Sequence, residues 1–387
     1  MKKHLTIYAI LTLLITSSLY GCSSNNVDYN TNEPKPSSSM EATLTAETQA
    51  SNQPGEVSLL QVDRIDKIEN FNACFWISDD KILGFGNSLI PRPTGPNITY
   101  PDRPVQFYST SDKSLESIDD FELGRFSSMG LISPDKKNVV LQDKMSGEAI
   151  FNTESKKTLP LNSSEGFFEY VWINNNEFIY LSKDTGVVYK YNIAGTDSKI
   201  CNLDKTKSFE SIFMLDDRIY LIETLNYDKE LSVAYYTDSS FSELHKLCEF
   251  NGQVSLVENE IILKKLNSSA KAASDSEGYS NSDYTTVRLD NNFNVKDTLV
   301  DEGVSVVDIN DKNVLYISKL ENKAVLYTMD LASKKTVELY SSDMQLGSYD
   351  NHKFGISDNQ KKLFLNFVND DESLDRDHYK TVIINFK

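Results

Sequence analysis

The sequence predicts an all-β fold, and two observations lead to this prediction. From residue 70 onward one pattern returns seven times: a short apolar strand, a polar turn rich in Asp and Asn, and a second apolar strand, as in a β-hairpin. Apolar residues at helical spacing are nearly absent from the same region. The predicted hairpins cover residues 75–83, 131–140, 171–179, 212–220, 255–262, 306–315 and 354–363.

Each predicted hairpin is followed by two further strands. The third strand carries an aromatic residue three positions before Asp or Asn, as in Tyr189 with Asn192 and Tyr327 with Asp330. The fourth alternates between polar and apolar residues, as in residues 335–340. Four short antiparallel strands over roughly 40 to 55 residues are typical of a propeller blade. We therefore predict a seven-bladed β-propeller of four-stranded antiparallel blades, with six or eight blades as alternatives.

The two ends of the repeat region predict how the ring closes. The last unit ends with a third strand, residues 381–386, and lacks an outer strand. Residues 57–62 form a spare apolar strand just before the first unit. A ring of sheets is expected to close without leaving a sheet edge exposed. We therefore predict that residues 57–62 pair with residues 381–386, and that the propeller domain spans residues 57–387.

Two short motifs carry a family resemblance. Residues 133–137 (SPDKK), which precede an apolar strand, and residues 327–331 (YTMDL) resemble the repeat of TolB-like and related WD-type propellers. The resemblance covers nearly all of residues 57–387, and its motifs identify the architecture alone. It implies a binding or scaffolding role with protein or glycan partners.

The N-terminal segment predicts export and lipidation. Lys2 and Lys3 precede an apolar run, residues 5–15, that is shorter than the ~20 residues needed to span a bilayer. Residues 19–22 (LYGC) resemble the cleavage motif of bacterial lipoproteins, which implies a signal peptide at residues 1–21 and a lipid on Cys22. An ordinary cleaved signal or a short anchor helix is the alternative. We expect a disordered tether at residues 22–56 and a lipid-anchored protein on the extracytoplasmic face of the membrane.

Charge and missing motifs narrow the predicted function. A net charge of −18 disfavours nucleic acid and anionic lipid as partners. No catalytic motif, phosphate-binding loop or metal-ligand spacing is recognisable, so we expect no enzyme activity, no metal and no cofactor. The first hypothesis is a protein-binding or scaffolding module with an envelope protein as partner. The alternatives are a surface receptor for glycans or small ligands, and a polysaccharide lyase or hydrolase.

The long connections predict where a binding site lies. Residues 87–103, 225–230, 267–283 and 370–379 each join the second strand of a unit to its third, so they extend over one rim of the ring. Long loops on a rigid scaffold often carry binding residues. Tyrosines would offer stacking faces, arginines would donate hydrogen bonds, and the aspartates form an acidic loop. The candidate rim residues are Arg92, Tyr100, Arg103, Tyr227, Tyr279, Asp370, Asp371, Arg376 and Tyr379.

Overall fold

The structure is a computed structural model. It describes residues 59–86, 104–118, 128–143, 147–161, 167–182, 186–204, 206–270, 279–320, 323–347, 352–369 and 378–387. The chain divides into two units, residues 1–56 and 57–387, and every described residue belongs to the second. The predicted signal peptide, the lipid site at Cys22 and the tether therefore lie outside the described residues. Within the described part, no helix has the length and apolar character needed to cross a membrane.

The described residues confirm the predicted all-β fold. Apart from one short 3-10 turn, η2 (Asn281–Asp283), their regular structure consists of strands. The strands are β1 (Val62–Glu69), β2 (Phe71–Ser78), β3 (Lys81–Gly86), β4 (Val105–Ser109), β5 (Ser114–Ser117), β6 (Ser128–Ile132), β7 (Asn138–Asp143), β8 (Gly147–Asn152), β9 (Lys157–Pro160), β10 (Phe167–Trp172), β11 (Glu177–Ser182), β12 (Val187–Asn192), β13 (Thr196–Asn202), β14 (Phe209–Leu215), β15 (Arg218–Asn226), β16 (Leu231–Thr237), β17 (His245–Val257), β18 (Glu260–Leu266), β19 (Tyr284–Leu289), β20 (Val295–Val300), β21 (Ser305–Ile309), β22 (Asn313–Leu320), β23 (Lys323–Asp330), β24 (Thr336–Ser342), β25 (Gln345–Leu346), β26 (Phe354–Ile356), β27 (Lys362–Asn369) and β28 (His378–Phe386).

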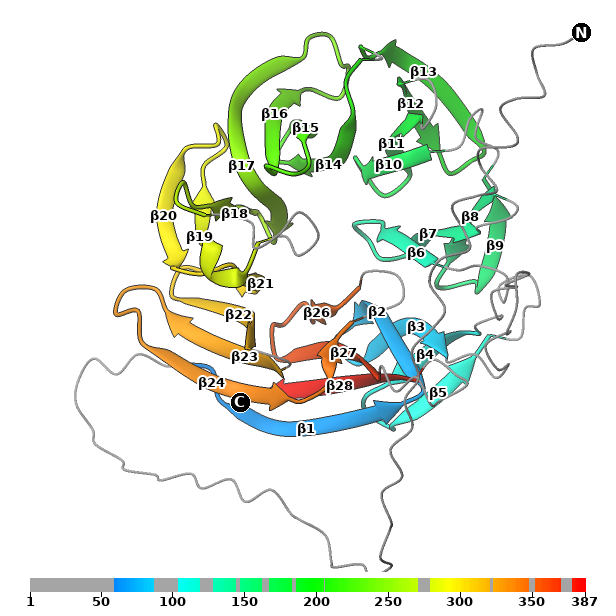
Figure 1. Ribbon diagram of the computed structural model, residues 1–387. Coiled ribbons are helices and arrows are strands. Elements are labelled where there is room, and N and C mark those ends of the chain that lie inside the picture. Colours follow the sequence, from blue (N-terminus) through cyan, green and yellow to red (C-terminus); the bar gives the residue numbers. More distant parts are fainter. Residues whose placement is uncertain are drawn as a thin grey trace, which may run out of the picture. The chain divides into compact units, whose positions relative to one another are not determined.

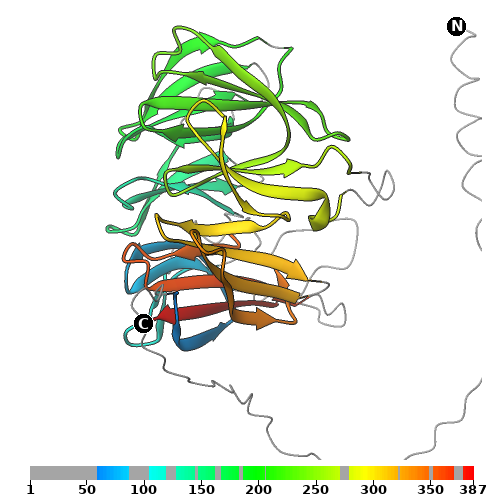
Figure 2. The ribbon, with the colours of Figure 1, turned by 90° about the vertical axis from the view of Figure 1, so that its left-hand side faces the viewer.

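The strands form antiparallel sheets in a propeller-like arrangement. Four sheets contain four strands each, in sequence order: β2–β5, β6–β9, β10–β13 and β21–β24. Strands β14–β20 form one seven-stranded sheet, and the last sheet contains β1, β28 and β27 with β25 and β26. Figure 1 shows the sheets around a common centre, with first strands such as β6 and β10 innermost and last strands such as β9 and β13 outermost. Figure 2 shows the same sheets from the side.

All seven predicted hairpins are antiparallel strand pairs. They correspond to β2–β3, β6–β7, β10–β11, β14–β15, β17–β18, β21–β22 and β26–β27. Local apolar patterning with Asx-rich turns is sufficient to specify these pairs, because the strands are adjacent in sequence. The hairpins were therefore the part of the fold most directly readable from sequence.

Strand β17 joins two units without a break. Its first half pairs with β16 and its second half with β18, so it passes from the outside of one unit to the inside of the next (Figure 1). Gly252 lies between the halves with φ +130°, a conformation that favours glycine. A Cβ atom at this position would lie 1.9 Å from the carbonyl oxygen of Lys264. Gly252 thus allows β17 to approach the end of β18 closely.

The N-terminal strand pairs with the last strand, but not at the predicted residues. Strand β1 pairs antiparallel with β28, from Val62 opposite Phe386 to Glu69 opposite Lys380. The prediction named the correct partner and placed the N-terminal strand too early, at residues 57–62. The physical reason is that β1 is an outer strand with mixed burial, which suits its polar sequence VDRIDKIE better than an apolar run.

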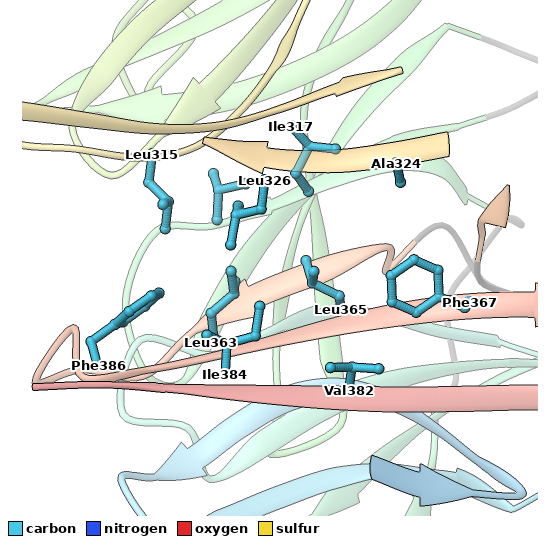
Figure 3. Close-up of a cluster of buried hydrophobic side chains, with 11 residues drawn as sticks. Leu315, Ile317, Ala324, Leu326, Leu363, Leu365, Phe367, Val382, Ile384 and Phe386 are labelled. Carbon is cyan, nitrogen blue, oxygen red and sulfur yellow. The ribbon is translucent and has the colours of Figure 1, made fainter. Parts of the chain in front are cut away.

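Apolar cores fill the spaces between neighbouring sheets. In the cluster of Figure 3, Leu315, Ile317 and Leu326 from β22 and β23 face Leu363 and Ile384 from β27 and β28. The other labelled residues of this core are Ala324, Leu365, Phe367, Val382 and Phe386. These two sheets thereby bury apolar faces against each other, which a single unit could not achieve alone.

Both tryptophans make equivalent contacts between sheets. The Trp172 indole, on β10, donates a hydrogen bond to the Leu131 carbonyl on β6 (Nε1–O 3.1 Å), and the Trp76 indole, on β2, donates to the Gly355 carbonyl on β26 (2.8 Å). The second contact joins the first sheet to the last. Asn366, fully buried on β27, reinforces it by accepting from the Ala73 amide (3.1 Å) and donating to the Ala73 carbonyl (2.6 Å).

Candidate functional site

The predicted rim residues differ in whether the structure describes them and in how exposed they are. Arg92, Tyr100, Arg103, Asp370, Asp371 and Arg376 lie outside the described residues. Tyr227 is 69% exposed, as a binding residue would be. Tyr379 is 7% exposed on β28, so the prediction that it offers a stacking face is wrong. The reason is that Tyr379 belongs to strand β28 and not to the connection before it, so its side chain leaves a face of a sheet and is buried there.

Two of the predicted connections come together. The Tyr279 hydroxyl, before β19, donates a hydrogen bond to the carbonyl of Asp228 in the turn between β15 and β16 (3.2 Å). Tyr279 also packs edge-on against Tyr284, with 6.2 Å between ring centroids. The structure therefore places the described parts of these connections on the same rim, where second strands end and third strands begin.

A cavity lined by lysines opens at this rim, and we call it the lysine pocket. Its volume is about 230 Å³. Among its lining residues are four lysines and no Asp or Glu, in a chain with 57 acidic and 39 basic residues. The pocket is lined by Lys264, Asn281, Gly303, Ser305, Ile317, Lys319, Lys323, Ala324, Gln345, Leu346 and Lys353.

Strand geometry places these lysines. Lys264 and Lys319 lie near the ends of β18 and β22, which are the second strands of neighbouring units. On β18, Lys264 follows Ile262 on the face that packs toward β21 and β22, because side chains alternate along a strand. On β22, Lys319 follows Ile317, whose side chain belongs to the core of Figure 3. On each strand, a lysine at the rim thus follows a buried isoleucine on the same face of the strand.

Hydrogen bonds hold one wall of the pocket. Asn281, in η2, donates from its side chain to the carbonyl of Lys319 (3.2 Å), and its own carbonyl accepts from the Gly303 amide (2.8 Å). This wall crosses from the connection before β19 to the end of β22. The end of β22 is therefore held against the 3-10 turn that precedes β19.

The lysines of the pocket differ in their electrostatic surroundings. Burial and the neighbouring charge of Lys353 lower the pKa of Lys264, with Glu230 acting in the opposite direction. Lys323 forms an ion pair with Asp343 (2.8 Å). Within the described part of the chain, Lys264, Lys319 and Lys353 have no ion-pair partner within 4 Å. The pocket therefore offers positive charge to an incoming anion.

Glu230 lies close enough to influence Lys264. Its Oε1 atom accepts hydrogen bonds from the Tyr284 hydroxyl (2.7 Å) and the Gln253 side chain (3.1 Å). Its Oε2 atom is buried and has no hydrogen-bond partner among the described residues. Burial and this carboxylate raise the pKa of Tyr284, which stays a hydrogen-bond donor at neutral pH.

Three glutamates lie near the same rim, on β10, β14 and β15, and we call Glu169, Glu210 and Glu223 the carboxylate cluster. Burial and the neighbouring Glu210 raise the pKa of Glu169 to about 7. Glu210 accepts a hydrogen bond from Thr224 (2.8 Å). Glu223 is buried and accepts from Lys207 (2.8 Å) and from the Tyr235 hydroxyl (2.7 Å).

Sequence reasoning found neither of these groups. The lysines come from separate strands whose meeting depends on how neighbouring sheets pack, and Glu169 and Glu210 belong to different units. One usable signal was present: Lys264 and Lys319 both end apolar second strands, where a solvent-facing rim was predicted. The described residues contain no group of three or more His, Cys, Asp or Glu side chains that could hold a metal ion.

Comparisons with known proteins show a shared fold. No family model matches the sequence, and neither does any curated protein. Two similar solved structures are an oligogalacturonate lyase in complex with manganese and an oligogalacturonate lyase from Vibrio parahaemolyticus. The first has a TM-score of 0.55 and 10% identity over 84% of this chain and 91% of that one. The second has a TM-score of 0.54 and 10% identity over 84% and 90%.

This likeness corrects the prediction that the chain is not an enzyme. At 10% identity the comparison shows the fold alone, but both of these proteins are named as lyases. The missing sequence motif was therefore a poor argument, because residues from different blades can meet to form a site that no short motif records. The described residues do not reproduce a metal centre that would correspond to the manganese of the first neighbour.

Proposed function

We propose that the protein is a lyase that cleaves an acidic oligosaccharide at the lysine pocket. The observation that carries this proposal is the set of four lysines around a cavity without acidic lining residues, in a chain of net charge −18. Such a cavity suits a ligand that carries carboxylates. The names of the structural neighbours support the class of substrate, because oligogalacturonate is a chain of sugars that each bear a carboxylate.

The chemistry that fits this pocket is β-elimination. In a uronate unit, the C5–H bond and the bond between C4 and the glycosidic oxygen break, and a C4=C5 double bond forms. The C5 proton becomes more acidic when the neighbouring carboxylate is neutralised, a role for Lys319 and Lys353. Lys264 accepts the C5 proton as general base, and the leaving oxygen takes up a proton from water.

The lowered pKa of Lys264 supports its assigned role. A general base needs a neutral form at working pH, and burial next to another lysine favours the neutral amine. Lys319 and Lys353 are exposed and suit the binding of a carboxylate. No step of this proposal passes through a metal.

The experiment follows product formation by the full-length protein on oligogalacturonate, through the ultraviolet absorbance of the C4=C5 double bond. We expect turnover by the wild type and a loss of at least about 100-fold in Lys264→Met. Lys312→Met is the matched control, since Lys312 is an exposed lysine in the hairpin between β21 and β22, at the opposite rim. Wild-type protein that forms no unsaturated product, or a Lys264→Met variant with full turnover, would contradict the lyase proposal.

We also propose that the described strands belong to a closed ring of seven blades. The two halves of β17 each complete a four-stranded unit, and β1 supplies the outer strand of the last. The hydrogen bonds of Trp76 and Asn366 between the first and last sheets support closure. Deletion of residues 62–69 should then lower the melting temperature strongly, and an unchanged melting temperature would argue for an open array.

Attachment to the membrane is a further part of the proposal. The support is the sequence of residues 1–22, with its two lysines, short apolar run and terminal cysteine. We propose that a lipid on Cys22 holds the protein at the extracytoplasmic face. Cys22→Ser should move the protein from the membrane fraction to the soluble fraction, and retention of this variant in the membrane would contradict the proposal.

A further inference from the structure

A second cavity lies on the other face of β18, and we call it the wide cavity. Its volume is about 820 Å³. Its walls come from β17, β18, β19 and β20 and from the connection that follows β18. Like the lysine pocket, it has lysines and no Asp or Glu among its lining residues. The polar residues that matter here are Lys229, Asn251, Lys265, Asn267 and Tyr279.

Strand β18 separates the two cavities. Lys264 and Lys265 are consecutive residues, so their side chains leave the strand on opposite faces. Lys264 lines the lysine pocket, and Lys265 lines the wide cavity. Strand β18 ends one residue later, at Leu266, which also lines the wide cavity. A ligand that crosses the end of this strand would therefore reach both cavities.

Hydrogen bonds within the protein hold the walls of the wide cavity. The Asn251 side chain donates to the Lys229 carbonyl (2.9 Å), and the Thr285 hydroxyl donates to the Asn267 side chain (2.9 Å). The Gly252 amide donates to the Glu230 carbonyl (2.9 Å), which fixes β17 against the turn before β16. A cavity built in advance loses less entropy on binding than one that a ligand must order.

The lining chemistry indicates a sugar chain with repeated negative charges. Two lysines offer charge, two asparagines offer amide hydrogen bonds, and Tyr279 offers an aromatic ring to the face of a sugar. The lysine pocket, at about 230 Å³, is smaller than the roughly 300 to 1,000 Å³ of sites for drug-sized ligands, whereas the wide cavity falls inside that range. The first thus suits the reacting unit and the second suits further units of the same chain.

We propose that the wide cavity is a distal subsite for the acidic oligosaccharide whose reacting unit lies in the lysine pocket. This inference rests on the proposed function and extends it to substrate length. Short substrates fill the lysine pocket alone. Longer ones cross the end of β18 and place a carboxylate near Lys265 and a sugar ring near Tyr279. The protein consequently prefers longer acidic oligosaccharides to short ones.

The test is isothermal titration calorimetry of the full-length protein with a galacturonate disaccharide and a hexasaccharide in which a methylene group replaces each glycosidic oxygen, so that wild type cannot cleave them. We expect the hexasaccharide to bind wild type more tightly than the disaccharide. Lys265→Met should weaken hexasaccharide binding about tenfold and leave disaccharide binding unchanged, since one charge-assisted contact is lost. Lys265→Arg keeps the positive charge and should keep most of the wild-type affinity for the hexasaccharide. Lys319→Met, which removes a lysine that binds the carboxylate of the reacting unit, should weaken both ligands, and Lys312→Met should weaken neither.

Several outcomes would overturn the inference. If Lys319→Met weakens both ligands but Lys265→Met weakens neither, or weakens both equally, the distal subsite is refuted while the lysine pocket stands. If neither saccharide binds wild type, the proposed function and the inference fail together. Polyglutamate that binds as tightly as the hexasaccharide, and that also depends on Lys265, would refute the assignment to a saccharide. Such a result would indicate a general site for polyanions. Thermal melting of each variant checks that the fold is intact.

Discussion

The lysine pocket and the carboxylate cluster lie at the same rim of the molecule, and they differ in whether their charged side chains have partners within the protein. In the cluster, Glu223 and Glu210 accept hydrogen bonds from Lys207, Tyr235 and Thr224, and Glu169 is favoured in its protonated form. In the lysine pocket, three of the four lysines have no ion-pair partner among the described residues. The difference teaches that Glu223 and Glu210 have partners within the fold, while the pocket leaves charge available to a ligand. Glu223 should therefore contribute to stability and the lysine pocket to binding.

The largest expected effect on stability comes from Glu223. Glu223→Ala removes the acceptor of Lys207, which is half-buried, and of Tyr235, which is buried, so we expect a loss of about 3 kcal/mol in the free energy of unfolding. Urea denaturation measures this change. Glu338→Ala, an exposed glutamate on β24, is the control and should change stability by less than about 0.5 kcal/mol. Equal effects of the two substitutions would remove the distinction between a satisfied cluster and ordinary surface charge.

The next effect depends on pH. The pKa of Glu169 is raised to about 7 in the folded protein from an ordinary value of 4.5, so the folded state binds the proton more tightly than the unfolded state. The stabilisation from this group is complete below pH 4.5 and is lost as the pH rises through about 7. Glu169→Gln should match wild type near pH 5 and exceed it by about 2 kcal/mol near pH 8, a value reduced for partial solvation of the rim. Urea denaturation at both pH values gives the comparison, and a constant difference between the proteins would refute it.

The smallest effect on stability should have the opposite sign. Lys264→Met replaces a half-buried amine without an ion-pair partner by an apolar side chain of similar shape, so we expect an increase of about 1 kcal/mol at neutral pH. The gain should shrink as the pH rises, because wild-type Lys264 then loses its charge and the burial penalty with it. Loss of turnover together with gain of stability would sharpen the contrast with Glu223. Loss of both would place Lys264 among the structural residues.

Much of the fold could be predicted from sequence, and the site could not. Each hairpin is specified by neighbouring residues, such as the strands on either side of the turn at residues 79–80, so local pattern was enough. The pairing of the N-terminal strand with β28 was predicted, but apolarity was the wrong guide to its position, because an outer strand is partly exposed. The lysine pocket unites Lys264 with Lys353, which meet through the packing of separate sheets. No pattern along the chain records that packing.

Pairing of β1 with β28 also bears on the mechanics of the protein. Residues before β1 enter the sheets next to Val62, opposite Phe386, and the ladder continues to Glu69 opposite Lys380. A pull transmitted from the N-terminal segment would act first on this ladder, ahead of any inner strand. Its resistance depends on the number of hydrogen bonds that share the load along β1. The strand that covers the edge of the last sheet is thus also the element that would set the force at which the domain begins to unravel.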